Sequence, residues 1–526
     1  MDDKLREEIN RRRTFAIISH PDAGKTTLTE KFLLFGGAIN TAGSVKGKAN
    51  SKYAVSDWMD IEKERGISVT SSVLQFNYDG YCINILDTPG HQDFSEDTYR
   101  TLMAADSAVM VIDASKGVEA QTIKLFKVCV MRHIPIFTFI NKMDRDARDT
   151  FELLDDIETV LGIKTCPVNW PIGSGKEFKG VYDRKTKIVS TFQAISTGGA
   201  KKAEETDYHI DDEALKELVG PYLFDQFNEE IELIDGATEE MDIEKVRAGE
   251  LSPVFFGSAL NTFGIEQFLN YFLKMTTPPI GRNSSEGIID PVTEPFSAFV
   301  FKIQANMNKA HRDRIAFMRI CSGKFEAGME VYHAASKRKI KLSQPQQLMA
   351  QDRKIVDEAY AGDVIGVFDP DLFSIGDTLT TGGKKFEYEG IPTFAPEHFC
   401  RVVQLNSMKR KQFVKGVTQI AQEGAIQIFQ EYTAGLSEII VGVVGVLQFD
   451  VLKYRLENEY GCEIRLEPIP YNYIRWVKDP TIDVTKLKRV SDVKKVKDMK
   501  GNPLLLFANE WVIDQVLQHN EGLELE

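Results

Sequence analysis

The chain has 526 residues, which is enough for about three domains at roughly 100–200 residues each. Its content of 43% hydrophobic and 27% charged residues is typical of globular proteins. The net charge of −14 excludes a surface coated in positive charge for indiscriminate nucleic-acid binding, although a local basic face stays compatible with it.

The N-terminus is too polar for a signal peptide, and no apolar run approaches the ~20 residues of a membrane span. The six cysteines are scattered and form no CxxC pair, which argues against a disulfide framework or a zinc knuckle. We therefore expect a cytoplasmic protein with reduced thiols and no membrane partner.

A phosphate-binding loop is predicted near the N-terminus. The β-prone run Thr14–Ser19 is followed by a glycine-lysine-threonine turn and by a helix expected over Leu28–Phe35. Gly24 would let backbone amides approach phosphates, Lys25 would reach the β and γ oxygens, and the Thr26 hydroxyl could ligate Mg²⁺. The first glycine of the usual pattern is replaced by a serine. The predicted nucleotide-binding residues of this segment are Ser19, His20, Pro21, Asp22, Ala23, Gly24, Lys25, Thr26 and Thr27.

A second candidate segment ends a predicted hairpin. Its strands are Val69–Tyr78 and Tyr81–Leu86, joined by an Asp-Gly turn that favours a tight hairpin. Asp87 could hold the Mg²⁺ shell through water, and the Gly90 amide could contact a γ-phosphate. The nucleotide-binding candidates here are Asp87, Thr88, Pro89, Gly90 and His91.

Two further segments suit a guanine base. Strands are predicted over Ala108–Asp113, Ile134–Ile140 and Pro253–Phe256. The Asp144 carboxylate could accept hydrogen bonds from N1–H and the 2-amino group of guanine, which adenine cannot supply. Each motif alone is weak, but the motifs in order at strand ends form a strong signal. The base-binding candidates are Asn141, Lys142, Met143, Asp144, Ser258, Ala259 and Leu260.

Together these motifs resemble those of the translational GTPases: SHPDAGKTT (19–27), ERGIS (64–68), DTPGH (87–91), NKMD (141–144) and SAL (258–260). The resemblance implies an α/β P-loop G domain followed by a β-barrel domain and an α+β domain. It implies GTP/GDP and Mg²⁺ as cofactors, with Thr26, Ser68 and, via water, Asp87 at the metal. It also implies that His91 is catalytic and positions the attacking water. Ser68 stands where most relatives carry threonine, but it keeps the hydroxyl.

The expected domains are a G domain over 1–282 with an insertion around 165–250, a β-barrel over 290–388 and an α+β domain over 393–526. The insertion should begin with short strands and continue from Glu204 to Glu250 as acidic, helical sequence. A loop connector is expected up to about Val292. The glycine- and lysine-containing stretch Gly173–Lys176 is interpreted as a polar turn rather than a second phosphate loop, and His20 as structural rather than a base.

Segments in all three predicted domains closely resemble the bacterial peptide chain release factor 3 family, among them 14–31, 56–59, 93–102, 299–307, 311–314, 391–397 and 444–451. That resemblance implies a ribosome-dependent GTPase of termination that promotes dissociation of the codon-reading release factors after peptide release. The implied partners are the ribosome, both its RNA and its proteins, and those release factors, with a monomer expected off the ribosome. Basic stretches at 337–341, 409–411 and 486–500 are either solvated surface or contacts to ribosomal RNA.

Three alternatives stay open at this point. An elongation-factor-G-like ribosomal GTPase is opposed by the short chain after residue 396. A P-loop phosphotransferase would not need Asp144, and a scaffold that binds nucleotide without hydrolysis would not need His91.

Overall fold

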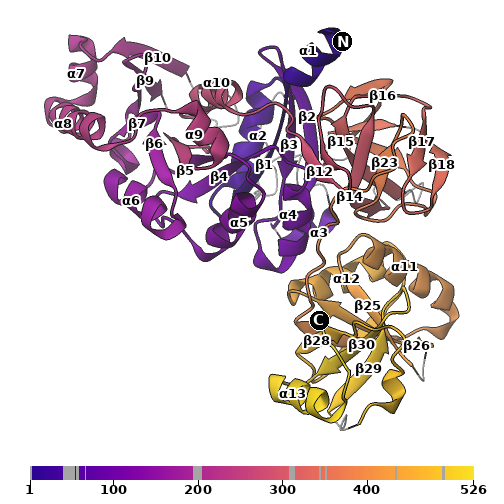
Figure 1. Ribbon diagram of the computed structural model, residues 1–526. Coiled ribbons are helices and arrows are strands. Elements are labelled where there is room, and N and C mark those ends of the chain that lie inside the picture. Colours follow the sequence, from indigo (N-terminus) through magenta and orange to yellow (C-terminus); the bar gives the residue numbers. More distant parts are fainter. Residues whose placement is uncertain are drawn as a thin grey trace.

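The computed structural model describes residues 3–39, 54, 59–65, 67–193, 204–306, 314–342, 345–349, 352–432, 435–488 and 492–526. Residues 56–58, 66, 194–203, 307, 311–313 and 489–491, which belong to segments discussed above, lie outside this range. The G domain and the β-barrel domain lie side by side, and the C-terminal domain contacts both (Figure 1). The predicted fold class is confirmed.

The G domain is built on a sheet whose strands run in the order β2-β3-β1-β4-β5-β11-β6. All neighbouring pairs are parallel except β2 and β3. In such a sheet the carboxyl ends of the parallel strands share one edge, where ligands bind. The strands are β1 (Arg12–Ser19), β2 (Ser72–Tyr78), β3 (Tyr81–Asp87), β4 (Ser107–Asp113), β5 (Ile136–Asn141), β6 (Lys164–Pro167) and β11 (Leu251–Phe256).

The predicted β2–β3 hairpin is present, with a two-residue turn. Asp79 has a φ of 47° and Gly80 a φ of 80°, so both central residues adopt the left-handed conformation that a type I′ turn requires. This turn sets the register that pairs Ser72 with Asp87.

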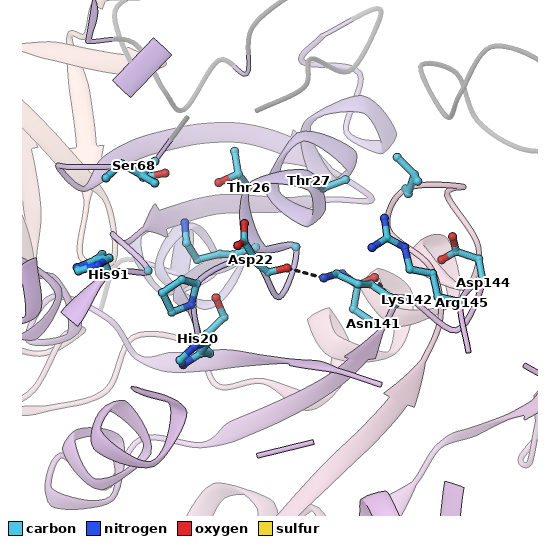
Figure 2. A pocket seen from close by; sticks show the side chains of 17 residues that line it. His20, Asp22, Thr26, Thr27, Ser68, His91, Asn141, Lys142, Asp144 and Arg145 are labelled. Carbon is cyan, nitrogen blue, oxygen red and sulfur yellow. Dashed lines mark hydrogen bonds between the residues drawn. The ribbon is translucent and has the colours of Figure 1, made fainter. Parts of the chain in front are cut away.

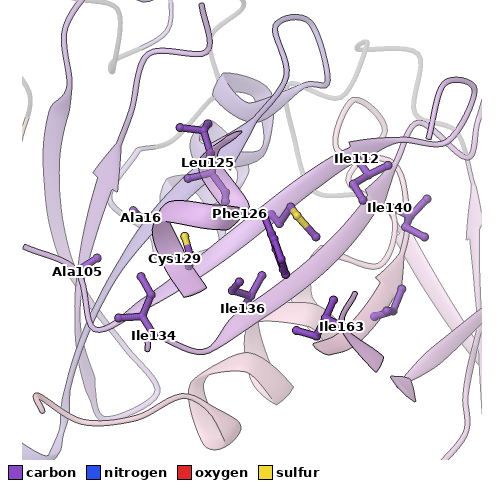
Figure 3. Packing of buried hydrophobic residues seen from close by; sticks show 14 of the residues in the cluster. Ala16, Ala105, Ile112, Leu125, Phe126, Cys129, Ile134, Ile136, Ile140 and Ile163 are labelled. Atoms are coloured by element: carbon purple, nitrogen blue, oxygen red, sulfur yellow. The ribbon is translucent and has the colours of Figure 1, made fainter. Parts of the chain in front are cut away.

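Helices cover both faces of this sheet. Along β1 the side chains alternate: Phe15 and Ile17 join the core beneath α2 and α10, whereas Ala16 and Ile18 join the core beneath α5 and α6. Figure 3 shows the second core, where Leu125, Phe126 and Cys129 of α5 pack onto the strands. The helices are α2 (Lys25–Phe35), α3 (Asp60–Arg65), α4 (Ser95–Leu102), α5 (Ala120–Met131), α6 (Thr150–Leu161) and α10 (Ile265–Met275).

The insertion forms a four-stranded antiparallel sheet in the order β10-β9-β8-β7, flanked by helices. The expectation that the acidic stretch is helical from Glu204 onward was wrong for its first residues. They form β10, which pairs in register with β9, because a neighbouring strand edge satisfies their backbone groups. The elements are β7 (Asn169–Ile172), β8 (Gly180–Asp183), β9 (Ile188–Gln193), β10 (Glu204–His209), α7 (Glu213–Val219), α8 (Pro221–Ala237) and α9 (Ile243–Ala248).

The connector after the G domain forms a small hairpin, β12 (Arg282–Ser284) with β13 (Gly287–Ile289), where a loop was expected. The β-barrel domain follows. Its strand β19 pairs with β2 at Met349 and Leu74, so one 15-stranded sheet runs through both domains. The barrel strands are β14 (Ser297–Ala305), β15 (Arg314–Ser322), β16 (Lys324–Glu326), β17 (Glu330–His333), β18 (Arg338–Lys341), β19 (Gln346–Met349), β20 (Asp352–Ile355), β21 (Glu358–Tyr360), β22 (Val364–Phe368) and β23 (Thr378–Thr380).

The N-terminal helix α1 (Asp3–Asn10) packs on the barrel rather than on the G-domain sheet. Ile9 is 1% exposed and belongs to the barrel core, and Leu5 packs against the same cluster. The polar sequence of this segment gives no sign of that contact.

The C-terminal domain has a seven-stranded antiparallel sheet in the order β27-β24-β26-β25-β29-β30-β28. Helices α11 and α12 bury Phe413, Val417, Leu452 and Leu456 against one face of it. Its elements are β24 (His398–Gln404), α11 (Arg410–Gln422), β25 (Gln427–Glu431), β26 (Gly435–Val443), α12 (Leu447–Asn458), β27 (Ile464–Pro468), β28 (Tyr473–Trp476), β29 (Val493–Lys497), β30 (Pro503–Phe507) and α13 (Glu510–His519).

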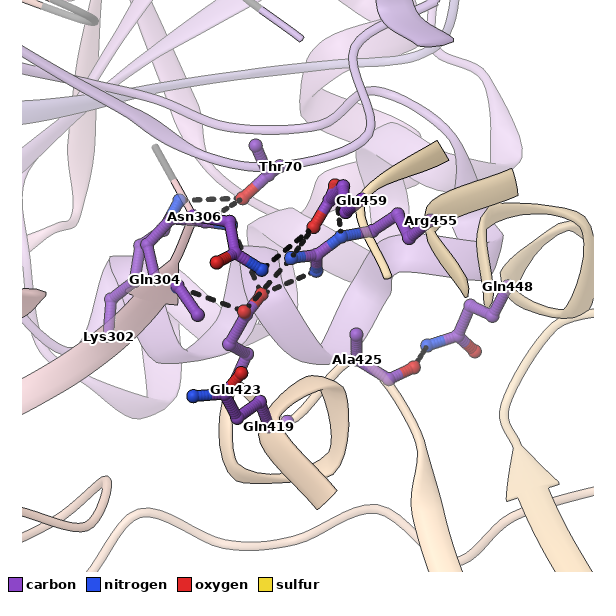
Figure 4. A network of polar contacts seen from close by, with 12 residues as sticks. Thr70, Lys302, Gln304, Asn306, Gln419, Glu423, Ala425, Gln448, Arg455 and Glu459 are labelled. Carbon is purple, nitrogen blue, oxygen red and sulfur yellow. Dashed lines mark hydrogen bonds and ion pairs between the residues drawn. The ribbon is translucent and has the colours of Figure 1, made fainter. Parts of the chain in front are cut away.

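All three domains meet at a buried polar network around Glu423 (Figure 4), which we call the domain junction. Glu423 accepts hydrogen bonds from Arg455 Nη1 at 2.6 Å and from the backbone N–H of Ala305 in β14 at 2.9 Å. Arg100 of α4 donates to the Gly424 carbonyl at 2.9 Å. Although burial opposes its charge, the carboxylates of Glu423 and Glu459 hold the pKa of Arg455 well above its ordinary value. The domain junction comprises Asp97, Arg100, Lys302, Gln304, Ala305, Glu423, Arg455 and Glu459.

Candidate functional site

A cavity of about 460 Å³ opens at the carboxyl edge of the G-domain sheet (Figure 2). It brings together the loops that follow β1, β3, β5 and β11, as the topology requires. The residues that line it are Ser19, His20, Pro21, Asp22, Gly24, Lys25, Thr26, Thr27, Ile67, Ser68, Gly90, His91, Asn141, Lys142, Asp144, Arg145 and Leu260.

The loop after β1 needs glycine at position 24. Gly24 has a φ of 100°, and a Cβ there would lie 2.2 Å from Nδ2 of Asn141. The residue precedes α2, so the backbone N–H groups of the first helical turn face the cavity and favour an anion.

Lys25 is 5% exposed and forms an ion pair with Asp87 at the end of β3. The Thr88 hydroxyl behind them donates to the Ile17 carbonyl at 2.7 Å and ties the two loops together. The ammonium group of Lys25 is therefore held in position by the carboxylate of the second motif.

Asn141 clamps the loops to one another. Its Nδ2 donates to the Ala23 carbonyl at 2.8 Å, and its Oδ1 accepts from the Ala259 N–H at 2.8 Å. Asp144 accepts from the Ser258 hydroxyl at 2.5 Å, which orients the carboxylate at the cavity wall.

Lys142 stands on the same wall and donates to Asp113 at 2.7 Å. Burial opposes ionisation of Asp113, but hydrogen bonds from Lys142 and Ser115 lower its pKa below the ordinary value. The charge of Lys142 is thus neutralised by a strand-end carboxylate rather than aimed at the cavity centre.

Two histidines line the cavity, and their surroundings differ. His20 lies 3.4 Å through Nε2 from Glu119. His91 accepts at Nδ1 from the backbone N–H of Asp93 at 3.2 Å and is about one-third exposed. In Figure 2 the ring of His91 is turned away from Thr26 and Asp22.

Fourteen of the sequence-predicted residues together with Ser68 form the wall, and the rest lie just behind it. The residues behind the wall are all buried: Ala23, Asp87, Thr88, Pro89, Met143, Ser258 and Ala259. Ile67 and Arg145 line the cavity but were not predicted; each adjoins a predicted residue, which is the signal that could have found them. Gly173–Lys176 lies outside the wall, and its last two residues begin a 3₁₀ helix, η2 (Gly175–Glu177), where a polar turn was expected. The Gly175 N–H donates to the Met143 carbonyl at 2.8 Å.

Three family descriptions match successive parts of the chain. "Elongation factor Tu GTP binding domain" matches residues 10–278, and "Elongation factor G domain 2" matches residues 295–382. "Class II release factor RF3, C-terminal domain" matches residues 388–517.

Curated relatives match the chain over nearly its whole length. Peptide chain release factor 3 of Symbiobacterium thermophilum is 57% identical over 521 residues, which cover 99% of this chain and 98% of the relative. The chain belongs to the peptide chain release factor 3 family. The family members of Gloeothece citriformis and Synechococcus elongatus are 52% and 53% identical, each over 99% of this chain and over 96% and 94% of their own lengths.

Membership of the release factor 3 family makes this protein a GTPase of translation termination that binds guanine nucleotides. The third domain matches the release factor description, so the elongation-factor-G-like alternative is disfavoured. A crystal structure of a Thermus thermophilus protein shares the fold, with a TM-score of 0.70, 22% identity and coverage of 88% of this chain and 69% of that one. None of the helices in the described part of the chain combines the length and the apolar character that crossing a membrane needs.

Proposed function

We propose that this cavity binds GTP and that the ribosome stimulates hydrolysis there, so that codon-reading release factors dissociate after peptide release. The observation that carries the proposal is the convergence of the five sequence motifs on one cavity in a release factor 3 chain. Lys25 and the amides that begin α2 bind the phosphates. The Asp144 carboxylate reads the guanine edge, and the Ala259–Leu260 backbone supports the base.

The oxygen donors at the phosphate end suit Mg²⁺. Thr26 and Ser68 line the same cavity, and Asp87 lies just behind its wall, paired with Lys25. Hard hydroxyl and carboxylate oxygens, together with phosphate oxygens, are what this ion prefers. Thr26 and Ser68 would hold it directly and Asp87 through water. A bound Mg²⁺ supplies neutralisation of the charge that develops on the β and γ oxygens.

His91 follows Gly90, which lines the cavity and whose N–H would meet a γ-phosphate. The imidazole then reaches the water that attacks in line, provided that the ring turns from its present orientation toward the phosphates. His20 lines the same cavity and lies 3.4 Å through Nε2 from Glu119, so it supplies a matched control.

The test is single-turnover hydrolysis on ribosomes at saturating GTP. His91→Ala is expected to retain GTP affinity and to slow hydrolysis about 10²–10⁴-fold, the usual contribution of such a group. His20→Ala should stay within about threefold of the unmodified protein. A His91→Ala rate within that same range would assign the role to another group. A release-factor dissociation assay, run in parallel, tests the termination step.

The remaining surface suits oriented docking on the ribosome from a cytoplasmic pool of monomers. Arg338, Lys339, Lys409 and Lys411 are exposed on the second and third domains, where they can contact RNA phosphates. All six cysteines are buried and unpaired, as reduced thiols are in the cytoplasm. We also propose that the domains extend over residues 1–282, 290–388 and 393–526.

A further inference from the structure

His91 is restrained by a residue two positions along the chain. The Asp93 N–H donates to Nδ1 of His91 at 3.2 Å, and Asp93 Oδ1 lies 3.1 Å from the same nitrogen. These contacts accompany the ring orientation away from Thr26.

Asp93 is in turn held by the C-terminal domain. Its Oδ2 accepts from the backbone N–H of Leu447, the first residue of α12, at 2.8 Å. The residue before that helix, Val446, offers no side-chain cap, so the carboxylate that caps α12 comes from the G domain. A carboxylate at a helix N-terminus gains from both the hydrogen bond and the helix dipole.

The approach of the two domains at this point requires glycine. A Cβ on Gly445 would lie 2.2 Å from Cγ and 2.5 Å from Cα of Asp93, which is closer than packed atoms tolerate. Gly445 has no positive φ, so only the proximity of Asp93 argues against a side chain there.

Helix α12 also packs on the segments that flank the cavity. Val451 lies in one apolar cluster with Met59, Ile61, Val69 and Phe94. Arg65 of α3 pairs with Asp450 of α12 at 3.0 Å. Withdrawal of the C-terminal domain would therefore remove the cap, the cluster and the ion pair together.

We propose that Asp93 is a positioning residue which, while it caps α12, holds the His91 imidazole in an unproductive orientation until the C-terminal domain moves away. This inference rests on the proposed function of His91. The docked arrangement leaves the ring turned away from Thr26, beside which the phosphates and the attacking water would lie.

The experiment measures hydrolysis of GTP without ribosomes. Gly445→Ala should displace Asp93 from α12 and raise the single-turnover rate about fivefold or more, since a lost cap shifts an equilibrium by about that factor. Gly390→Ala is the matched control, because nothing lies within 4 Å of a Cβ there and the φ is not positive. It should leave the rate unchanged.

A second pair of variants covers the case in which Gly445→Ala does not fold. Asp93→Ala removes the cap and should raise the ribosome-free rate. Asp93→Asn keeps an oxygen that can accept from the Leu447 N–H, so its rate should stay near that of the unmodified protein. ¹⁵N spectra of the histidine side chains supply a readout that a purely structural role would not move. The His91 side-chain signal, assigned through His91→Ala, should shift in Gly445→Ala and in Asp93→Ala and stay unchanged in Gly390→Ala.

The outcomes separate this inference from the proposed function. An unchanged ribosome-free rate in Gly445→Ala and Asp93→Ala overturns the positioning role, even if His91→Ala slows the ribosome-stimulated reaction. A rate gain that persists in the double variant Gly445→Ala/His91→Ala also overturns it, because the gain would not pass through His91. If His91→Ala leaves the ribosome-stimulated hydrolysis rate unchanged, the proposed role of His91 is overturned, and this inference with it.

Discussion

The nucleotide cavity and the domain junction are both rich in charge, but they hold it in opposite ways. In the cavity, Lys25 and Asp144 stand at the wall of a space of about 460 Å³ that can admit a large polar ligand. At the junction, a space of only about 50 Å³ remains, and Glu423 and Arg455 satisfy one another through two hydrogen bonds. Charged groups at the cavity can bind an incoming anion, whereas those at the junction are paired with one another and hold the domains together.

The largest expected effect is a loss of folding stability from a substitution at the domain junction that leaves the cavity intact. In Glu423→Gln the buried Arg455 guanidinium keeps only one carboxylate partner, Glu459. Removal of one partner from a buried ion pair costs about 3–5 kcal/mol of folding stability. We expect a lower unfolding temperature by calorimetry and GTP affinity within about twofold of the unmodified protein. Glu459→Gln, which removes the more exposed partner of Arg455, is the control and should have a smaller effect. Equal losses of stability and GTP affinity would mean that the two regions are not separable.

Asp144→Asn addresses the cavity alone. The amide donates where the carboxylate accepted, so GTP binding should weaken by about 2–4 kcal/mol and xanthosine triphosphate should gain relative to GTP. Calorimetric titration measures both. Asp146→Asn, two residues on and exposed outside the wall, should bind like the unmodified protein. Unchanged GTP affinity in Asp144→Asn would remove Asp144 from the base site.

Ser68→Ala distinguishes two parts of the cavity. Because Lys25 would meet the β-phosphate common to both nucleotides, Lys25→Ala should weaken GDP and GTP alike. Ser68→Ala should weaken GTP about tenfold and spare GDP, since its hydroxyl would act only in the γ-phosphate state. Equal losses for the two nucleotides in Ser68→Ala would contradict that state dependence.

Asp97 gives the junction a pH dependence. Burial opposes its ionisation, but the charges of Lys302 and Arg100 and two hydrogen bonds from Ser71 together lower its pKa. A carboxyl whose folded pKa lies below its unfolded value, about 3.9, stabilises the fold above that pH and loses this contribution as the pH falls through the folded pKa. Asp97→Asn should therefore cost about 1–2 kcal/mol at pH 7 and progressively less below about pH 4. A cost that stays constant to about pH 3 in denaturation curves would argue against the ion pair.

The difference between the two regions also explains what the sequence could predict. Asn141 and Ala23 are 118 residues apart, yet each lies in a short segment whose residue types suit a phosphate or a base. Glu423 meets Ala305 across 118 residues and Arg100 across 323. Arg100 and Ala305 lie in segments that resemble the release factor 3 family, but no residue type or spacing in those segments indicates a contact between domains. The motifs therefore predicted the cavity wall, whereas the junction becomes visible only when the three domains are packed.

The same reasoning applies to the elements. Apolar, β-prone strands such as β1 and β4 were predicted nearly to their ends. Strand β10 and the β12–β13 hairpin carry polar, helix-compatible or loop-like sequence, and only pairing with a neighbour makes them strands. The cap that Asp93 places on α12 has no local signature, because the helix and its cap are 354 residues apart.

The pairing of β19 with β2 has a consequence for solubility. Strand β2 ends the G-domain part of the sheet, and an uncovered edge strand offers its backbone groups to any other chain. The barrel strand pairs with that edge through Met349 and Leu74, the third residue of β2. A G domain cut out at residue 282 would present the edge to a second copy of itself, and cross-chain strand pairing is the expected result. The backbone contact that joins the two domains therefore also guards the chain against self-association.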